Sequence, residues 1–325
     1  MNDGGQAVLQ HHPVMLDEVL EALQINAEGV YVDCTFGRGG HSRGILQRLG
    51  PRGRLIALDS DPQAVCYAQQ TIQDSRFSIV HCQFATLDEV MTRFDVARVD
   101  GILMDLGVSS PQLDDAQRGF SFRYDGPLDM RIDYHSGFTA AQWLAQAPLQ
   151  ELVAVLVTYG EEPFAKRIAK AIVAARKQQP IVSTLQLAHI VSAVLPRSHT
   201  GKHPATKTFQ AIRIYINREL EQLRAVLPQV VRRLVARGRW VVISFHSLED
   251  RCVKQFMRMA SQADYWPKRL PLRQAEIGQA LLQLVGRMRR PSAAEIAANP
   301  RARSAMLRVA ERTHTPVNVK ALCCD

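Results

Sequence analysis

A glycine-rich run follows the first strongly apolar segment of the chain, and its residue types suit the binding of a polar ligand. The run DCTFGRGGH occupies residues 33–41. Glycine lets a backbone turn sharply and approach a ligand without a Cβ clash. Gly37 and Gly39 could begin a dinucleotide fingerprint, but Ser42 stands where its third glycine belongs, and no P-loop sequence follows. The run therefore predicts a binding turn of another type, with a purely structural turn as the alternative.

A second acid stands where it could bind the sugar of a nucleoside. Asp59 follows the apolar run at 54–58 and lies 20 positions after Gly39. A carboxylate there can accept hydrogen bonds from both hydroxyls of a ribose, whereas Asp61 is expected to cap the next helix. An acid, G-x-G-G and this second acid are typical of S-adenosylmethionine enzymes. Phe84 could stack on the adenine or simply pack in the core.

Two later polar segments also follow apolar strands. Ligands bind at the carboxyl ends of strands in open α/β sheets, and an unpaired buried carboxylate is costly, so we expect Asp105 to be functional. The run SFHSLEDR at 244–251 should lie at the same edge of the sheet. Ser247, with Asp250 three residues on, is expected to cap a helix, and His246 could either contact a base or serve the structure.

The elements that would position these residues alternate between β-branched runs and amphipathic stretches. This alternation predicts right-handed βαβ units and a parallel sheet. A long helix is expected over 208–236, with Gly238 just beyond its end. Strands are expected over residues 30–32, 54–58, 77–80, 99–104, 240–244 and 305–309.

The strand pattern stops in the middle of the chain and helical spacing replaces it. Thr139 and Gln142 form a capping box before an apolar run, and Ser183 or Thr184 is a natural N-cap. We therefore expect an inserted all-helical domain over 115–206 within an α/β domain formed by 1–114 and 207–325.

The chain is basic, with 40 Lys and Arg against 31 Asp and Glu and a formal charge of +9. This excess favours an anionic partner, nucleic acid before a membrane surface, although a merely basic enzyme is the alternative. Arginine suits phosphate because its guanidinium fork matches the phosphate oxygens. Nine arginines late in the chain form two groups: Arg232, Arg233, Arg237 and Arg239, then Arg287, Arg289, Arg290, Arg301 and Arg303.

Cysteine use and hydropathy favour a cytoplasmic protein that has no membrane partner. The six cysteines form no C-x-x-C pair and fit neither a zinc site nor a disulfide framework, so no metal is expected. No run reaches the roughly 20 apolar residues that span a bilayer, and residues 1–13 lack the apolar core of a signal peptide.

Seven motifs in one order make the sequence specific. They are DCTFGRGGH at 33–41, MDLGVSSPQLD at 104–114, RGFSF at 118–122, DGPLDMR at 125–131, KHPAT at 202–206, SFHSLEDR at 244–251 and NPRARS at 299–304. From about His12 to Thr313 the chain resembles the bacterial 16S ribosomal RNA cytosine-N4 methyltransferases of the MraW or RsmH type.

This resemblance implies a Rossmann-type class I methyltransferase fold with an inserted helical domain that recognises RNA. The substrate would be cytosine 1402, in the RNA's own numbering, of 16S rRNA in the small ribosomal subunit or its assembly intermediate. The oligomeric state stays open, a dimer included. The residues implied to contact S-adenosylmethionine, the methyl donor, are Gly39, Gly40, His41, Asp59, Phe84, Asp105 and Gln112.

The chemistry of the acceptor leaves one role open. Many amino-methyltransferases carry Asp-Pro-Pro-Tyr after the fourth strand, whereas this chain has Asp-Leu-Gly-Val from Asp105. Asp105, the expected catalytic residue, could therefore polarise the target amine, bind the donor, or do both. Methylation at cytosine C5 is disfavoured because it needs a cysteine nucleophile, and Cys252 is expected inside a helix. The alternative function is an RNA-binding ribosome-assembly factor with a vestigial methyltransferase fold.

Overall fold

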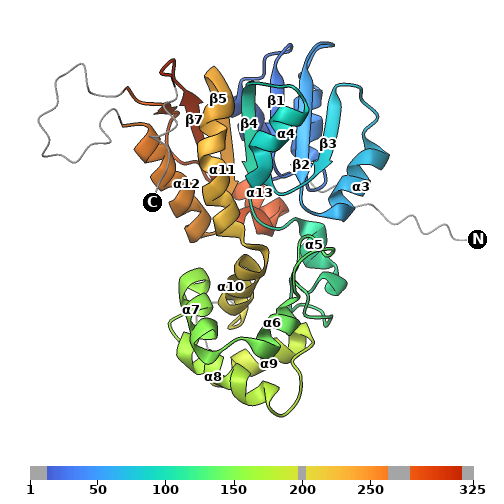
Figure 1. The fold of residues 1–325 in the computed structure, drawn as a ribbon, viewed down its shortest axis with the longest axis vertical. Helices are drawn as coiled ribbons and strands as arrows, with labels where there is room; N and C mark the ends of the chain where they lie inside the picture. The colour runs from blue at the N-terminus through green and yellow to red at the C-terminus, as the bar shows by residue number, and fades with distance from the viewer. Residues whose placement is uncertain (1–12, 197–202, 263–278, 317–325) are drawn as a thin grey trace, which may run out of the picture. The chain divides into compact units, whose positions relative to one another are not determined.

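The computed structural model describes residues 13–196, 203–262 and 279–316. The chain forms two compact units, drawn in Figure 1. Unit 1 comprises residues 1–106 and 223–325, and unit 2 comprises residues 107–222. Within the described ranges, no helix is long and apolar enough to cross a membrane.

Unit 1 is built on a seven-stranded sheet with the strand order β3-β2-β1-β4-β5-β7-β6. The first five strands are parallel to their neighbours, and β7 runs antiparallel to both β5 and β6. The strands are β1 Val30–Asp33, β2 Arg54–Asp59, β3 Phe77–His81, β4 Val99–Asp105, β5 Leu234–Ser244, β6 Leu282–Leu284 and β7 Met306–Arg312. All six expected strands are present, and β6 overlaps residues 283–287, where the sequence offered a short strand within a segment that was hard to assign.

Helices flank this sheet because successive residues of a buried strand point to opposite faces. On β5, Ile243 packs in one apolar cluster with Leu20 of α1 and Ile45 of α2, whereas the Trp240 ring meets Phe256 of α12 at a centroid distance of 6.0 Å. The helices of unit 1 are α1 Leu16–Leu23, α2 Gly40–Leu46, α3 Pro62–Thr71, α4 Leu87–Arg93, α12 Ser247–Ala260 and α13 Ala293–Ala298. This arrangement confirms the expected Rossmann-type class I methyltransferase fold.

The prediction of a single long helix over 208–236 is wrong. The structure has α10 Thr206–Asn217, a break at Arg218 with a left-handed φ of 52°, and then α11 Glu219–Arg233. Gly238 does not end a helix but lies inside β5. A Cβ on Gly238 would lie 2.9 Å from the carbonyl oxygen of Val235 and 3.1 Å from that of Asp100. Glycine is therefore needed there for a close approach of two backbones.

Unit 2 is helical, and within its described residues the only β pairing is a bridge between Pro127 and Ser183. The capping box of Thr139 with Gln142 and the N-cap at Ser183 are present as expected. Its helices are α5 Ser110–Asp114, α6 Ala140–Gln146, α7 Leu149–Gly160, α8 Ala165–Arg176, α9 Thr184–Val194 and α10.

The units divide at 106/107 and 222/223, whereas the sequence suggested borders at 114/115 and 206/207. The reason at the second border is packing. Phe209 and Ile212 of α10 are buried in the same apolar cluster as Leu152 of α7 and Ile168 of α8. A helix assigned to the sheet domain from its sequence thus completes the helical core.

Candidate active site

Three of the parallel strands end in an aspartate at the same edge of the sheet. β1 ends at Asp33, β2 at Asp59 and β4 at Asp105. β1 lies between the other two strands, so the turn that leaves β1 can contact both neighbours. Gly37 donates its backbone N–H to Asp59 Oδ2 at 2.7 Å, and Thr35 Oγ1 accepts the backbone N–H of Asp105 at 2.6 Å. One turn therefore holds two of the predicted site residues.

The glycine turn has a conformation and a packing that other residues would disturb. Gly37 and Gly39 have φ values of 58° and 71°, in the left-handed region that favours glycine. A Cβ on Gly39 would lie 2.5 Å from the Phe36 ring, and one on Gly40 would lie 2.8 Å from Pro13. The backbone from 37 to 40 thus lies against its own surroundings, with Gly40 opening α2.

Asp59 is half-buried, and both of its carboxylate oxygens accept hydrogen bonds. Besides the bond from Gly37, its Oδ1 accepts the backbone N–H of Asp61 at 2.8 Å. Burial raises the pKa of the Asp59 carboxyl to about 6, because the loss of hydration outweighs these two hydrogen bonds. Asp61 caps α3 as expected, accepting the N–H of Gln63 at 3.0 Å. Each oxygen of Asp59 keeps a second lone pair for a ligand hydroxyl.

Asp33 has a structural part that the sequence did not reveal. Its Oδ2 accepts the hydroxyl of Ser42 at 2.6 Å, and its Oδ1 accepts the backbone N–H of Thr35 at 3.1 Å. These bonds join β1 to α2 across the glycine turn. Burial raises the pKa of the Asp33 carboxyl to about 6. Ser42 excludes a dinucleotide fingerprint in the sequence, and the structure gives it this second, positive role.

Asp105 is the least satisfied of the three aspartates. Its Oδ1 is buried and has no hydrogen-bond partner among the described residues. Its Oδ2 lies 3.7 Å from Nδ1 of His41. Burial raises the pKa of the Asp105 carboxyl well above its ordinary range, and the charges of Asp33 and Glu249 raise it further. A buried, unpartnered acceptor oxygen at a strand end is the arrangement expected of a group that meets a ligand.

His41 is held by its other ring nitrogen. Nε2 lies 3.0 Å from the carbonyl oxygen of Val14, and because a carbonyl only accepts, Nε2 must carry a hydrogen. Nδ1 therefore faces Asp105, and α2 holds the ring in that direction.

The cap of α12 differs by one residue from the prediction. His246, not Ser247, is the N-cap: its Nδ1 accepts the backbone N–H of Glu249 at 3.4 Å. Glu249 Oε2 returns the bond by accepting the backbone N–H of His246 at 3.4 Å, and it also accepts that of Phe245 at 2.9 Å. Asp250 instead pairs with Arg308 at 2.7 Å. The capping box was missed in the sequence because Ser or Thr usually fills the position that His246 occupies. His246 therefore has a structural role.

The two remaining predicted site residues lie in different units. Phe84 opens a short 3₁₀ turn just after β3 in unit 1 and is half-buried. Gln112 belongs to unit 2, where its Oε1 accepts the backbone N–H of Ser109 at 2.7 Å and caps α5. Unit 1 thus contains six of the seven residues predicted to contact S-adenosylmethionine, all on elements at one edge of the sheet. The seventh is Gln112, and its role in the cap of α5 explains its burial.

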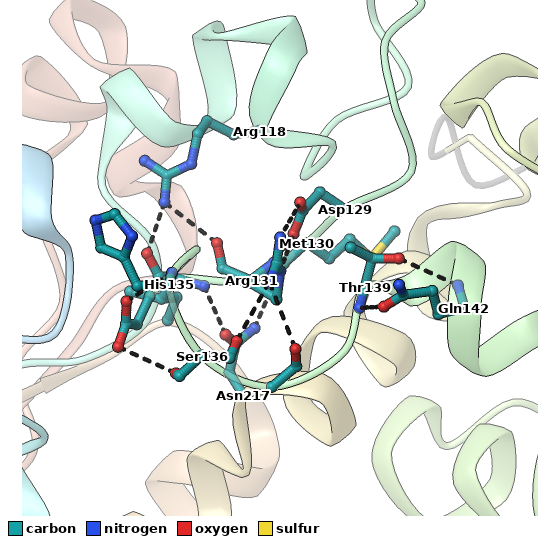
Figure 2. A network of polar contacts seen from close by, with 12 residues as sticks. Arg118, Asp129, Met130, Arg131, His135, Ser136, Thr139, Gln142 and Asn217 are labelled. Atoms are coloured by element: carbon teal, nitrogen blue, oxygen red, sulfur yellow. Dashed lines mark hydrogen bonds and ion pairs between the residues drawn. The ribbon is translucent and has the colours of Figure 1, made fainter.

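The motifs at 118–122 and 125–131 build a scaffold inside unit 2, shown in Figure 2. Asn217 Nδ2 donates to the carbonyl of Met130 at 2.7 Å, and Asn217 Oδ1 accepts the N–H of Ile132 at 2.7 Å. Arg118 Nη2 donates to the carbonyl of Ile132 at 2.8 Å. Arg131 pairs with Asp129 through two nitrogens at 2.8 Å. Side chains thus hold a segment that has no regular secondary structure of its own.

Several of the late arginines are neutralised by acids of unit 1. Arg232 and Arg233 both pair with Asp88, at 2.8 and 2.6 Å. Two others pair with acids distant in the sequence: Arg239 with Glu311 and Arg289 with Glu21, each at 2.8 Å. These four arginines share three acids, so all but one of their charges are balanced by contacts within unit 1.

Comparison with known proteins gives matches over almost the whole chain. The family model described as MraW methylase family matches residues 8–313. A Ribosomal RNA small subunit methyltransferase H of Thiobacillus denitrificans is 59% identical over 302 residues, 93% of this chain and 97% of that protein. One of the same name from Azoarcus sp. is 57% identical over 94% of this chain and 98% of that protein. A solved rRNA methylase of Streptococcus thermophilus aligns at a TM-score of 0.38 and 11% identity, over 92% of this chain and 94% of that one.

Proposed function

The chain belongs to the MraW methylase family, and from this premise and the geometry of unit 1 we propose that it transfers a methyl group from S-adenosylmethionine to ribosomal RNA of the small subunit. The names of the most similar relatives support the substrate class. The specific acceptor in this proposal is the N4 amino group of cytosine 1402, in the small subunit or its assembly intermediate.

The residues of unit 1 fit the methyl donor. Asp59 keeps two acceptor lone pairs for the ribose hydroxyls. A Cβ on Gly39 would meet the Phe36 ring and one on Gly40 would meet Pro13, so glycine is needed for this turn, whose backbone we propose to contact the donor's amino acid part. Phe84 is half-buried after β3 and available to stack on the adenine. The full set that we propose for the donor is Gly39, Gly40, His41, Asp59, Phe84, Asp105 and Gln112.

One observation carries the proposal of catalysis: the buried, unpartnered Oδ1 of Asp105. The N4 lone pair of cytosine is delocalised into the ring, so the amine attacks well only if it pyramidalises. An oxygen that accepts a hydrogen bond from N4–H favours that geometry. Burial raises the pKa of Asp105 well above its ordinary range, so its carboxylate is better able to take the proton that the amine releases.

The protein's remaining contribution is position and shelter. The donor supplies an electrophilic methyl group when bound. Thr35 fixes the backbone of Asp105, and His41 lies beside its other oxygen, so the carboxylate is aimed before the RNA arrives. The target base has to leave its stack to reach the half-buried carboxylate of Asp105, and the helical unit 2 is proposed to hold the surrounding RNA.

The alternative, an assembly factor without activity, explains these residues poorly. Asp33 serves the fold, but an RNA-binding protein gains little from Asp59 and Asp105, whose loss of hydration raises their pKa values, because keeping such carboxylates costs folding free energy.

The test is a mass map of methylated nucleotides in small-subunit rRNA from cells with and without this protein. N4-methylcytosine at position 1402 should disappear without the protein, return with the wild type, and stay absent with Asp105→Asn. Asp95→Asn, at an exposed acid, is the matched control and should restore the mark. The proposal is wrong if the mark survives deletion, and Asp105 has no catalytic role if its asparagine variant restores the mark fully.

A further inference from the structure

The free positive charge of unit 2 is concentrated on one helix. Residues 107–222 contain thirteen Lys and Arg against ten Asp and Glu. Residues 163–182, which contain α8, have five of those cations and no acid. The rest of unit 2 is therefore slightly acidic, and the basic character of the unit is local. In Figure 1, α8 is the light-green helix of unit 2.

Helical geometry gathers three lysines of α8 into a stripe. At 3.6 residues per turn, Lys166, Lys170 and Lys177 point within about 40° of one another. All three are exposed, and exposed Arg167 lies beside them. At 1.5 Å per residue the stripe is roughly 16 Å long, which matches about five phosphates of a stacked strand at 3.4 Å each.

The lysine stripe, Lys166, Lys170 and Lys177, has no partner of its own. Neither these three side chains nor that of Arg167 forms an ion pair or a side-chain hydrogen bond with any residue that the structure describes. The fifth cation behaves differently, since half-buried Arg176 donates to the carbonyl of Leu144 at 2.5 Å. These charges therefore contrast with the paired arginines of unit 1 and are available to a partner.

The opposite face of α8 shows which kind of partner fits. Ile168 and Ile172 are fully buried in the core of unit 2, so α8 cannot turn an apolar face into a lipid surface as an interfacial helix does. Phe164, just before the helix, is 40% exposed. Ammonium groups on one side of a helix complement a chain of phosphates.

We propose that the lysine stripe of α8 binds the phosphate backbone of the RNA substrate. This inference rests on the proposed function and assigns part of its RNA-binding surface. Because contacts to phosphate release counterions, each one adds about 0.7 to the slope of log affinity against log salt for a single strand. Three such contacts add about 2, which is a roughly twenty-fold effect between 50 and 200 mM salt.

The test variant is the triple substitution Lys166→Gln, Lys170→Gln and Lys177→Gln. The matched control is Arg48→Gln, Arg54→Gln and Arg98→Gln, which removes the same charge from exposed positions in unit 1. Binding is measured between 50 and 200 mM salt with unmodified small-subunit rRNA made in vitro, and with intact small subunits from cells lacking this protein. S-adenosylmethionine binding by calorimetry checks that each variant is folded.

The lysine variant should lower the salt slope for protein-free rRNA by about 2 and raise KM for RNA at least tenfold. Its kcat at saturating RNA and its S-adenosylmethionine affinity should equal those of the wild type, and the control should keep the wild-type slope. An unchanged slope in the lysine variant overturns the proposal, as does an equal loss in the control. A loss seen with intact subunits but not with free rRNA also overturns it, in favour of an acidic protein partner.

Failure of the proposed function would look different. The wild-type protein would then bind rRNA with the lysine-dependent slope but produce no N4-methylcytosine.

Discussion

The carboxyl of Asp59 makes the affinity for S-adenosylmethionine depend on pH in a predictable direction. Its pKa is raised to about 6 by burial, and ribose hydroxyls donate best to the ionised form. With a pKa near 6, roughly nine-tenths of the protein carries this carboxylate at pH 7 and roughly one-tenth at pH 5. The dissociation constant should therefore rise about tenfold between pH 7 and pH 5.

The stability of the free protein should change in the opposite sense. A carboxyl whose pKa is higher in the folded state than in the unfolded chain binds more protons when folded. Asp33 and Asp59, each raised to about 6, therefore destabilise the fold at pH 7. This part of the penalty is relieved as the pH falls from 7 towards 4, although other groups also titrate in that range. Binding should thus weaken over a range in which these two groups become less destabilising to the fold.

The assay is calorimetric titration of S-adenosylmethionine at pH 5, 6 and 7 for the wild type, Asp59→Asn and Asp33→Asn. Asp59→Asn keeps one acceptor oxygen and replaces the other by an NH2 group, so one hydrogen bond to a charged group, worth about 1.5–3 kcal/mol, is lost. It should weaken binding at pH 7 by about ten- to 150-fold and abolish the pH dependence. Asp33→Asn should keep the tenfold dependence, because Asp33 is bonded to Ser42 and Thr35.

Two results would refute this reasoning about Asp59. One is a wild-type dissociation constant that stays the same from pH 7 to pH 5. The other is a pH dependence that persists in Asp59→Asn and vanishes in Asp33→Asn, which would assign the titration to Asp33 and not to Asp59.

Three further predictions concern single contacts. Gly39→Ala, at a φ of 71° with the Phe36 ring in the way, should cost about 1–3 kcal/mol and weaken S-adenosylmethionine binding; unchanged calorimetry and melting would contradict it. His246→Ala should lower the free energy of unfolding in urea by about 1 kcal/mol through loss of the α12 cap, whereas His246→Ser should recover most of it; equal losses would argue against the cap. Asn217→Ala should speed amide hydrogen exchange at Ile132 and leave S-adenosylmethionine affinity unchanged; wild-type exchange would show that this side chain is dispensable.

The residues at the sheet edge were predictable because their signals are local. An acid directly after a β-branched run can be recognised from the sequence without knowing the fold. Asp59 and Asp105 were therefore predicted at strand ends, and β2 and β4 confirm this. The fold class followed from the same alternation of strands and helices. The roles of these acids towards the donor stay predictions.

What sequence reasoning missed depends on distant neighbours or on unusual local choices. Gly238 is required by the carbonyl of Asp100, a residue 138 positions earlier. Asp88 pairs with Arg233 across 145 positions, and no local sequence pattern predicts that pairing. The break at Arg218 uses a left-handed backbone without glycine. His246 caps a helix in place of the expected Ser247.

The hydroxyl of Thr35 has a practical consequence for redesign. It accepts the N–H of Asp105 at the end of β4, and it also helps to lower the pKa of Asp33 at the end of β1 through a hydrogen bond. A single oxygen therefore joins β1 to β4. An engineer who wishes to alter acceptor choice should therefore leave this threonine unchanged. Exchanging it for valine would keep the shape, yet loosen two acids at once.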